Sequence, residues 1–248
     1  MTVQNEDELR ALRKIGHIVA LVLKKMQEHA QPGMSTAELD EYGESLLLHV
    51  GARSAPQLVY DFPGATCISV NEEVAHGIPG ERILRAGDTV NIDVSAELDG
   101  YFADTGGTFA LPPISEIQRK ICYATHEALH DALDKARAGY RINAIGRAIE
   151  KRAAKHGFTT IRNLAGHGVG RALHEEPVNI VSYYEARDNR RLSEGMVVAI
   201  EPFLSTQCTA AEQADDGWTL MTSPGNLSAQ YEHTAVITRG KPLIMTAL

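Results

Sequence analysis

The stretch Thr89-Val-Asn-Ile-Asp-Val-Ser-Ala-Glu-Leu-Asp-Gly-Tyr-Phe-Ala-Asp-Thr105 decides the fold class. Its first half alternates apolar and polar residues, as a strand with one buried face does. Asp99-Gly100 is typical of a two-residue hairpin turn, which pairs Ser95 with Asp104 and makes Asp93 a diagonal neighbour of Asp104. Diagonal neighbours lie roughly 7 to 8 Å apart, so both carboxylates can approach one cation. Two strand aspartates are more often simply solvated, but aspartate is a poor strand former, and this pairing favours a cation.

Helical periodicity flanks the hairpin on both sides. Apolar residues recur at helical spacing over Asn5–Ala30 and again over Ser35–Val50, and the second segment opens with residues close to capping-box spacing. The same pattern predicts two further helices, over Ile114–Ala138 and Asn143–His156. Four helices are therefore expected, two before and two after the hairpin.

Beta-branched segments follow the second helix pair, at Phe158–Ile161, Met196–Phe203 and Gln230–Thr238. The order is helices, strands, helices, strands, which favours an α+β fold with two related halves around one sheet. No linker or low-complexity stretch divides the chain. Residues 1–248 are predicted to form one domain.

The composition describes an ordinary globular chain of 248 residues with a net charge of −8 and 44% hydrophobic residues. Its acidic balance disfavours nucleic acid as the main partner. The longest apolar run, His17–Leu23, is too short to cross a membrane. The three cysteines are scattered, which fits a reducing cytoplasm better than a disulfide framework or a zinc ribbon. A core of this size needs no metal, so a metal would be functional.

Two glutamates and two histidines stand in unusual surroundings. Glu201 and Glu232 each lie within an apolar, strand-like segment, and a buried carboxylate needs a partner. His167 is flanked by glycines, which predicts an imidazole open to a ligand, and His174 follows shortly after. Taken alone, either histidine is more commonly a surface residue or a satisfied core residue.

Two aspartates, two glutamates and a histidine carry more negative charge than one divalent ion neutralises. Two metal ions that share bridging carboxylates would balance it. Such a pair bridges a water molecule, lowers its pKa and polarises a carbonyl group. The residues therefore predict a dinuclear metal hydrolase that uses a bridging hydroxide.

Five segments together resemble the type I methionine aminopeptidases of the pita-bread metallopeptidase family. They are His76-Gly-Ile-Pro79, Asn91-Ile-Asp93 with Asp104-Thr105, Gly166-His-Gly-Val-Gly170, Ile200-Glu-Pro202 and Gln230-Tyr-Glu-His233. The resemblance runs from the first helix almost to the last residue. It implies an α+β pita-bread fold, in which two pseudo-symmetric halves of helices pack on a curved antiparallel sheet.

The resemblance also implies a role for each candidate residue. The metal ligands would be Asp93, Asp104, His167, Glu201 and Glu232, with Asp104 and Glu232 bridging. Glu201 would move the proton of the attacking water, His174 would contact the carbonyl group and His76 the substrate amide. The cofactor would be two divalent metal ions, and this ligand chemistry accepts Co, Mn, Fe or Zn.

The side-chain pocket matches the family less closely. Phe62, Cys67 and Trp218 stand in segments similar to those that bind the methionine side chain. Phe62 stands where many bacterial members have tyrosine, and Leu173 where an aromatic residue is expected. These differences concern the width of the pocket rather than the metal chemistry.

The function expected from this resemblance is removal of the initiator methionine from the N-terminus of nascent polypeptides in the cytoplasm. The chain would act as a monomer, with the ribosome as a further candidate partner and no membrane. One alternative is a pita-bread aminopeptidase that prefers another N-terminal side chain, for which Phe62 and Leu173 are the reason. The other is a catalytically silent module that binds nascent chains.

Overall fold

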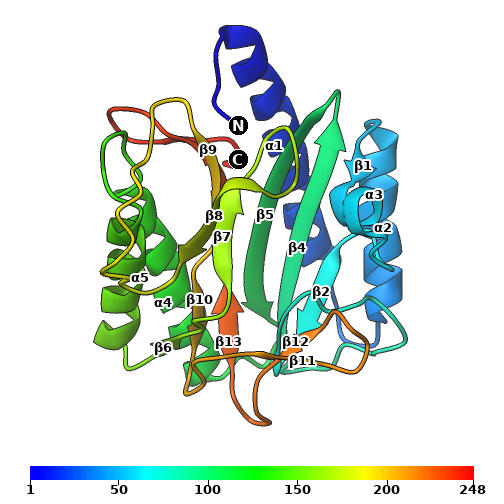
Figure 1. The fold of residues 1–248 in the computed structure, drawn as a ribbon. Coiled ribbons are helices and arrows are strands. Elements are labelled where there is room, and N and C mark those ends of the chain that lie inside the picture. The colour runs from blue at the N-terminus through cyan, green and yellow to red at the C-terminus, as the bar shows by residue number, and fades with distance from the viewer.

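Two pairs of long helices lie outside the strands in the computed structural model, which describes residues 1–248 (Figure 1). The first pair is α1 (Glu6–His29) and α2 (Thr36–His49), and the second is α4 (Glu116–Leu133) and α5 (Asn143–Lys155). A short helix, α3 (Ala55–Tyr60), lies beside the first pair. The four predicted helices are confirmed, whereas α3 was not predicted.

Capping residues fix where these helices begin. The side chain of Asn5 accepts a hydrogen bond from the N–H of Glu8, and Ser35 and Glu38 form the expected capping box at the start of α2. Helix α4 is shorter than the predicted range Ile114–Ala138. It begins after Ser115, which caps it, and it ends at Leu133 because the chain then turns.

The central hairpin has the predicted register. Strands β4 (Thr89–Leu98) and β5 (Tyr101–Ala110) pair Ser95 with Asp104 and Asp93 with Gly106. Asp99 and Gly100 both have positive φ, as the tight turn requires. Two aspartates from adjacent strands are thereby placed on one face.

The strands form antiparallel ladders in four sheets rather than one. One of the two larger sheets belongs to the first half of the chain and consists of β4 and β5 with β1 (Arg53–Ser54) and β2 (Cys67–Val70). The other belongs to the second half and consists of β7 (Ala165–Gly168), β8 (Glu175–Val181), β9 (Val197–Ile200), β14 (His233–Val236) and β15 (Leu243–Ile244). The smaller two are β6 (Thr159–Thr160), β10 (Phe203–Ser205) and β13 (Ser228–Gln230), and β3 (Glu73–Ala75), β11 (Glu212–Gln213) and β12 (Leu220–Met221). The α+β class and the antiparallel sheets are confirmed.

Each helix pair buries its apolar face against its own sheet. Ile15 and Leu39, from α1 and α2, share a core of 17 buried residues with Ile92 of β4. Ile121 and Ile145, from α4 and α5, belong to a separate core of 20 buried residues with strands of the second half. Two cores of similar size explain how one chain builds two halves with a seam between them.

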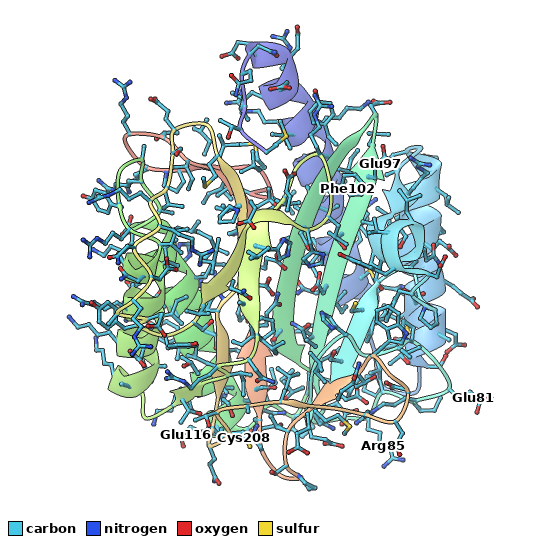
Figure 2. The ribbon with its side chains drawn as sticks, viewed as in Figure 1. Glu81, Arg85, Glu97, Phe102, Glu116 and Cys208 are labelled. Atoms are coloured by element: carbon cyan, nitrogen blue, oxygen red, sulfur yellow. The ribbon has the colours of Figure 1, made fainter.

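The seam lies where β5 approaches the segment that leads into β14. The N–H of Asp104 donates to Oγ1 of Thr234 (2.9 Å), and the hydroxyl of Thr105 donates to the carbonyl of Glu232 (2.9 Å). The hairpin tip, near Glu97 and Phe102, and Cys208 lie toward opposite ends of the molecule (Figure 2). Residues far apart in sequence therefore meet midway between these ends.

Candidate active site

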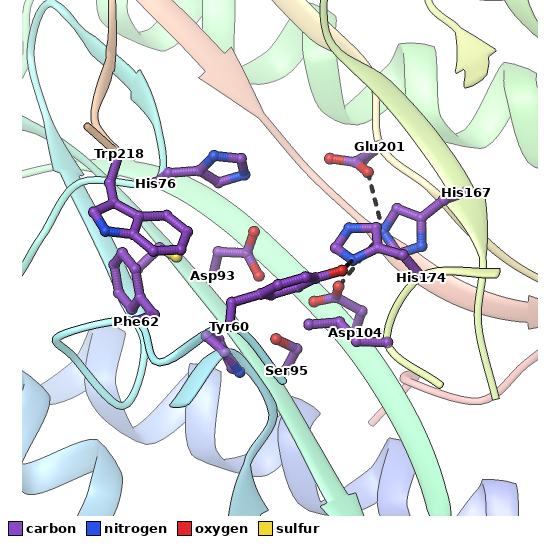
Figure 3. A pocket seen from close by; sticks show the side chains of 13 residues that line it. Tyr60, Phe62, His76, Asp93, Ser95, Asp104, His167, His174, Glu201 and Trp218 are labelled. Atoms are coloured by element: carbon purple, nitrogen blue, oxygen red, sulfur yellow. Dashed lines mark hydrogen bonds and ion pairs between the residues drawn. The ribbon is translucent and has the colours of Figure 1, made fainter. Parts of the chain in front are cut away.

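A cavity of about 250 Å³ opens at this seam, and it gathers nearly all of the predicted site residues (Figure 3). Its lining comprises Pro56, Tyr60, Phe62, Cys67, His76, Asp93, Ser95, Asp104, His167, Leu173, His174, Glu201 and Trp218. Of the predicted residues only Glu232 is missing from the lining, and it is buried with 2% of its surface exposed.

The two hairpin aspartates form one wall of the cavity. Asp93 and Asp104 both line the cavity, and the nearby charge of Asp104 adds to the effect of burial in raising the pKa of Asp93. The structure therefore brings the pair together as the predicted register requires. Ser95, opposite Asp104 in the ladder, also lines the cavity, although its sequence position alone gave no functional signal.

His167 comes from β7 and is less exposed than its glycine neighbours suggested. They were expected to leave the imidazole open to a ligand, and the residue does line the cavity, but only 6% of its surface is exposed. The glycines are needed for backbone packing: a Cβ on Gly166 would lie 2.4 Å from the carbonyl oxygen of Ala199, and one on Gly168 would lie 2.2 Å from that of Glu176. The sequence motif thus reports close strand packing around a buried histidine.

Nδ1 of His167 lies 2.9 Å from the carbonyl oxygen of Gly168. A carbonyl oxygen only accepts hydrogen bonds, so Nδ1 carries the proton and Nε2 keeps its lone pair. Nε2 lies 3.7 Å from an oxygen of Asp104 and 3.6 Å from an oxygen of Glu201. Burial lowers the pKa of His167 to about 3, with a smaller contribution from His174, which keeps the ring neutral.

The two glutamates approach the same point from the second half. Glu201 follows the last residue of β9 and precedes Pro202, which ends the strand there. Glu232 lies between β13 and β14, where Nε2 of Gln230 donates to one of its oxygens (3.1 Å). One potential ligand atom from each of Asp104, His167 and Glu232 lies within 4.8 Å of the others.

Burial raises the pKa values of all four carboxyl groups. The pKa of Asp104 rises to about 6, and those of Asp93, Glu201 and Glu232 rise well above their usual range, with repulsion among the group adding to the effect of burial. No lysine or arginine forms an ion pair with any of them. Four buried acids without a cation are expensive to ionise.

These residues fit a divalent metal ion. Oδ1 of Asp104 and Oε1 of Glu232 are buried and have no hydrogen-bond partner. Buried acceptors without donors, beside an imidazole lone pair, are the donor set that a cation requires. A metal at this position would supply the missing positive charge and satisfy both oxygens.

Two further histidines reach the cavity without joining this cluster. Burial lowers the pKa values of His76 and His174, and the charge of His76 lowers that of His174 further. Both are therefore available as neutral hydrogen-bonding groups at the wall. The ring of His174 lies 4.0 Å from that of His167 between centroids.

The remaining wall is apolar and aromatic. Phe62 and Trp218 meet edge to face at 5.2 Å between ring centroids, and Cys67 and Leu173 are buried beside the cavity. Burial, and then the nearby acids, raise the pKa of the Cys67 thiol well above its usual range, which keeps it uncharged. The cavity therefore combines a carboxylate cluster with an apolar wall, as an enzyme that binds one apolar side chain would.

Three cavity residues, Ser95, Pro56 and Tyr60, were not among the predicted site residues. Pro56 and Tyr60 come from α3, a helix too short for hydrophobic periodicity to indicate. The available signals were local: Ser54 caps the helix and Pro56 stands in its first turn.

A buried cluster of acids and histidine that fits a metal, open to a substrate-sized cavity, defines a metal-dependent hydrolase. The chain belongs to metallopeptidase family M24, whose sequence profile matches residues 10–239. The pita-bread fold characteristic of that family is confirmed. No helix is both long and apolar enough to span a membrane.

Individual relatives narrow the resemblance. The chain is 50% identical to methionine aminopeptidase 2 of Bacillus subtilis (strain 168), with 100% of both chains covered. It is 43% identical to a methionine aminopeptidase of Staphylococcus epidermidis, covering 100% of this chain and 99% of the relative. The crystal structure of methionine aminopeptidase from Thermotoga maritima superposes with a TM-score of 0.95 at 31% identity, again over 100% of both chains.

Proposed function

We propose that this chain is a methionine aminopeptidase that removes the initiator methionine from nascent polypeptides. The observation that carries the proposal is the cavity itself, because one wall is a buried metal-type cluster and the other is an apolar pocket near Phe62 and Trp218. Similarity to methionine aminopeptidases over the full length supports the same conclusion.

The proposed cofactor is two divalent metal ions, which Asp93, Asp104, His167, Glu201 and Glu232 would hold. The oxygens of Asp104 and Glu232 that lack a hydrogen-bond partner support a cation at this position, since both are buried acceptors without a donor. When bound, the ions would activate a water molecule and polarise the scissile carbonyl group. Co, Mn, Fe and Zn all suit carboxylate and imidazole ligands.

Other residues of the cavity would orient the substrate and move protons. Glu201, whose carboxyl pKa is raised by burial, would accept the proton of the attacking water and return it to the leaving amine. His174 would donate a hydrogen bond to the carbonyl oxygen as charge develops, and His76 would contact the substrate amide. Phe62, Cys67 and Trp218 would enclose the methionine side chain and exclude water.

We further propose that residues 1–248 act as one catalytic domain of the type I class. Residues from both halves line the cavity, so neither half holds the complete site. The expected substrates are the N-termini of new chains in the cytoplasm, with the protein acting as a monomer. Contact with the ribosome would bring those substrates to it.

Metal-stripped protein given one divalent ion at a time, with Met-Ala-Ser and Met-Lys-Ser as substrates, tests the proposal. We expect cleavage only with metal, and much faster cleavage of Met-Ala-Ser. Asp104→Asn should remove metal and turnover, whereas Asp99→Asn, an exposed aspartate of the same hairpin, should remove neither. Equal rates on both peptides would contradict initiator processing, and no metal-dependent turnover would favour the silent binding module.

A second candidate is an aminopeptidase with another side-chain preference. The observation that favours it is Leu173, which lines the cavity where the family resemblance led us to expect an aromatic residue. Rates for Met, Leu and norleucine at the first position of one tripeptide series separate the two candidates. A clear preference for leucine would replace methionine as the proposed substrate side chain.

A further inference from the structure

Tyr60 lines the cavity but has no part in the proposed reaction. It is the last residue of α3, and the helix ends there because Asp61 adopts a left-handed conformation with φ of 53°. The N–H groups of Asp61 and Phe62 donate back to the carbonyls of Gln57 and Pro56, which fixes the turn. The tyrosine side chain consequently extends across the cavity instead of leaving it (Figure 3).

The phenol of Tyr60 reaches His174 from the opposite half of the fold. Its oxygen lies 2.7 Å from Nδ1 of His174, and the two rings lie 5.6 Å apart between centroids. The residues are separated by 114 positions in the sequence. The contact therefore depends on the folded seam and connects α3 to the loop that precedes β8.

A neutral imidazole has one N–H group and one lone pair, and the partner of one nitrogen determines the state of the other. A phenol that donates to Nδ1 leaves the proton on Nε2. Burial raises the pKa of Tyr60 above its usual value, so the phenol keeps its proton. Nε2 of His174 makes no hydrogen bond within the protein and is the nitrogen available to a bound molecule.

The surroundings of His174 favour the proton on Nε2. The cavity that this ring enters is lined by the carboxyl groups of Asp93, Asp104 and Glu201, whose oxygens can accept a hydrogen bond in either protonation state. An N–H group at Nε2 therefore faces a wall that is rich in acceptors. A hydrogen-bond donor at Nε2 is also what a substrate carbonyl oxygen requires.

We propose that Tyr60 is a positioning residue, which donates a hydrogen bond to Nδ1 of His174, holds the ring as the Nε2–H tautomer and aims that N–H at the scissile carbonyl. The catalytic part of this inference rests on the proposed function of His174. The tautomer does not, because it is inferred from the contact with Tyr60 and from the acceptor-rich lining of the cavity. The two parts can therefore fail separately.

The test removes only the hydroxyl, with Tyr60→Phe. Tyr140→Phe is the matched control, since that tyrosine is 47% exposed and its hydroxyl makes no hydrogen bond within the protein. Zinc-loaded protein labelled with nitrogen-15 in its histidines is examined by long-range nitrogen–proton NMR at pH 8. We expect His174 in the Nε2–H form in wild type and Tyr140→Phe, and a shift toward the other tautomer in Tyr60→Phe.

Steady-state cleavage of Met-Ala-Ser supplies the second readout. Tyr60→Phe should lower kcat by about three- to tenfold, the range that one neutral hydrogen bond supplies, with KM nearly unchanged. An Nδ1–H tautomer in wild type, or identical His174 signals in wild type and Tyr60→Phe, would overturn the tautomer assignment. A change confined to KM would show that Tyr60 only lines the pocket, and unchanged kinetics would overturn its catalytic positioning. Absence of turnover by wild type would instead count against the proposed function.

Discussion

His167 and His174 have ring centroids only 4.0 Å apart, but their Nδ1 atoms have opposite kinds of partner. Nδ1 of His167 faces the carbonyl oxygen of Gly168, which can only accept a hydrogen bond. Nδ1 of His174 faces the hydroxyl of Tyr60, which can donate one. The first contact leaves a lone pair on Nε2 for a metal, and the second is proposed to leave a proton there for a carbonyl oxygen.

One fold thus obtains two chemistries from one residue type. The partner of His167 belongs to the backbone of its own strand, so no side-chain substitution removes it. The partner of His174 is a side chain from the other half and can be replaced without changing the backbone. His167 is also buried, whereas His174 is exposed to the cavity. The backbone thus sets the state of His167, whereas a replaceable side chain, Tyr60, is proposed to set that of His174.

The largest effect is expected from His167→Ala. Loss of an inner ligand should lower metal affinity by more than the roughly 10- to 100-fold that loss of an outer partner costs, and turnover should disappear at ordinary metal concentrations. The metal content that remains after dialysis and the metal dissociation constant from isothermal titration measure this loss of affinity. His17→Ala, an exposed histidine of α1, is the control. Full metal occupancy in His167→Ala would show that His167 is not a metal ligand, and the proposed difference between the two histidines would then be wrong.

His174→Ala should fail differently. Because its proposed hydrogen bond strengthens in the transition state, kcat should fall by roughly 10²- to 10³-fold while KM moves little. Metal stoichiometry should equal that of wild type. If titration shows that His174→Ala has lost a metal ion, or if its kcat is near wild type, His174 is not a residue that donates a hydrogen bond to the substrate carbonyl without binding metal.

Local signals account for what the sequence could predict of the fold. Asn5 and Ser35 cap their helices with side chains a few residues away, and Asp99-Gly100 alone specifies the hairpin register. The end of α4 depends instead on distant contacts. After Leu133 the chain turns so that the N–H of Ala138 can donate to the carbonyl of Thr238, although the apolar periodicity continues.

The residues of the candidate site also divide into those that local sequence predicts and those that depend on distant contacts. The positions of Asp93 and Asp104 follow from a strand register and could be derived from the sequence. The burial of His167 could not, because a glycine can indicate either open space or close packing, and only the carbonyl oxygens of Ala199 and Glu176 decide between them. The contact between Tyr60 and His174 could not be predicted either, since the two residues are 114 positions apart in the sequence.

Asp104→Asn changes the charge beside Nε2 of His167, which lies 3.7 Å from an oxygen of Asp104. In metal-free protein the folded pKa of Asp104, about 6, exceeds its reference value of 3.8. The stability that its protonated form contributes is fully present below 3.8 and is lost as the pH rises through about 6. The metal-free variant should therefore be more stable than wild type at pH 7, by up to about 3 kcal/mol.

Urea unfolding of both proteins in the presence of a chelator, between pH 4 and 8, measures this difference. The gap should be small near pH 4 and widen through pH 6, and saturating metal should reverse its sign. Asp99→Asn, exposed at the hairpin turn, should track wild type throughout. A gap independent of pH would mean that Asp104 is ionised in the metal-free fold and that the metal is not needed to neutralise it.

The smallest effect is expected at Leu173, the residue directly before His174 and part of the buried cavity wall. Replacing it with phenylalanine narrows an apolar pocket without touching a hydrogen bond. Preference among Met, Leu and norleucine at the first position should therefore shift by about 1 to 3 kcal/mol or less, the scale of a methylene-sized change in such a pocket. Ratios of kcat/KM measure the shift, with Leu48→Phe, 63% exposed on α2, as control.

If Leu173 acts only on side-chain fit, metal stoichiometry and the histidine tautomers stay as in wild type. An unchanged set of ratios would mean that Leu173 does not contact the substrate side chain, and a displaced His174 tautomer would mean that pocket width and the carbonyl donor are coupled through this loop.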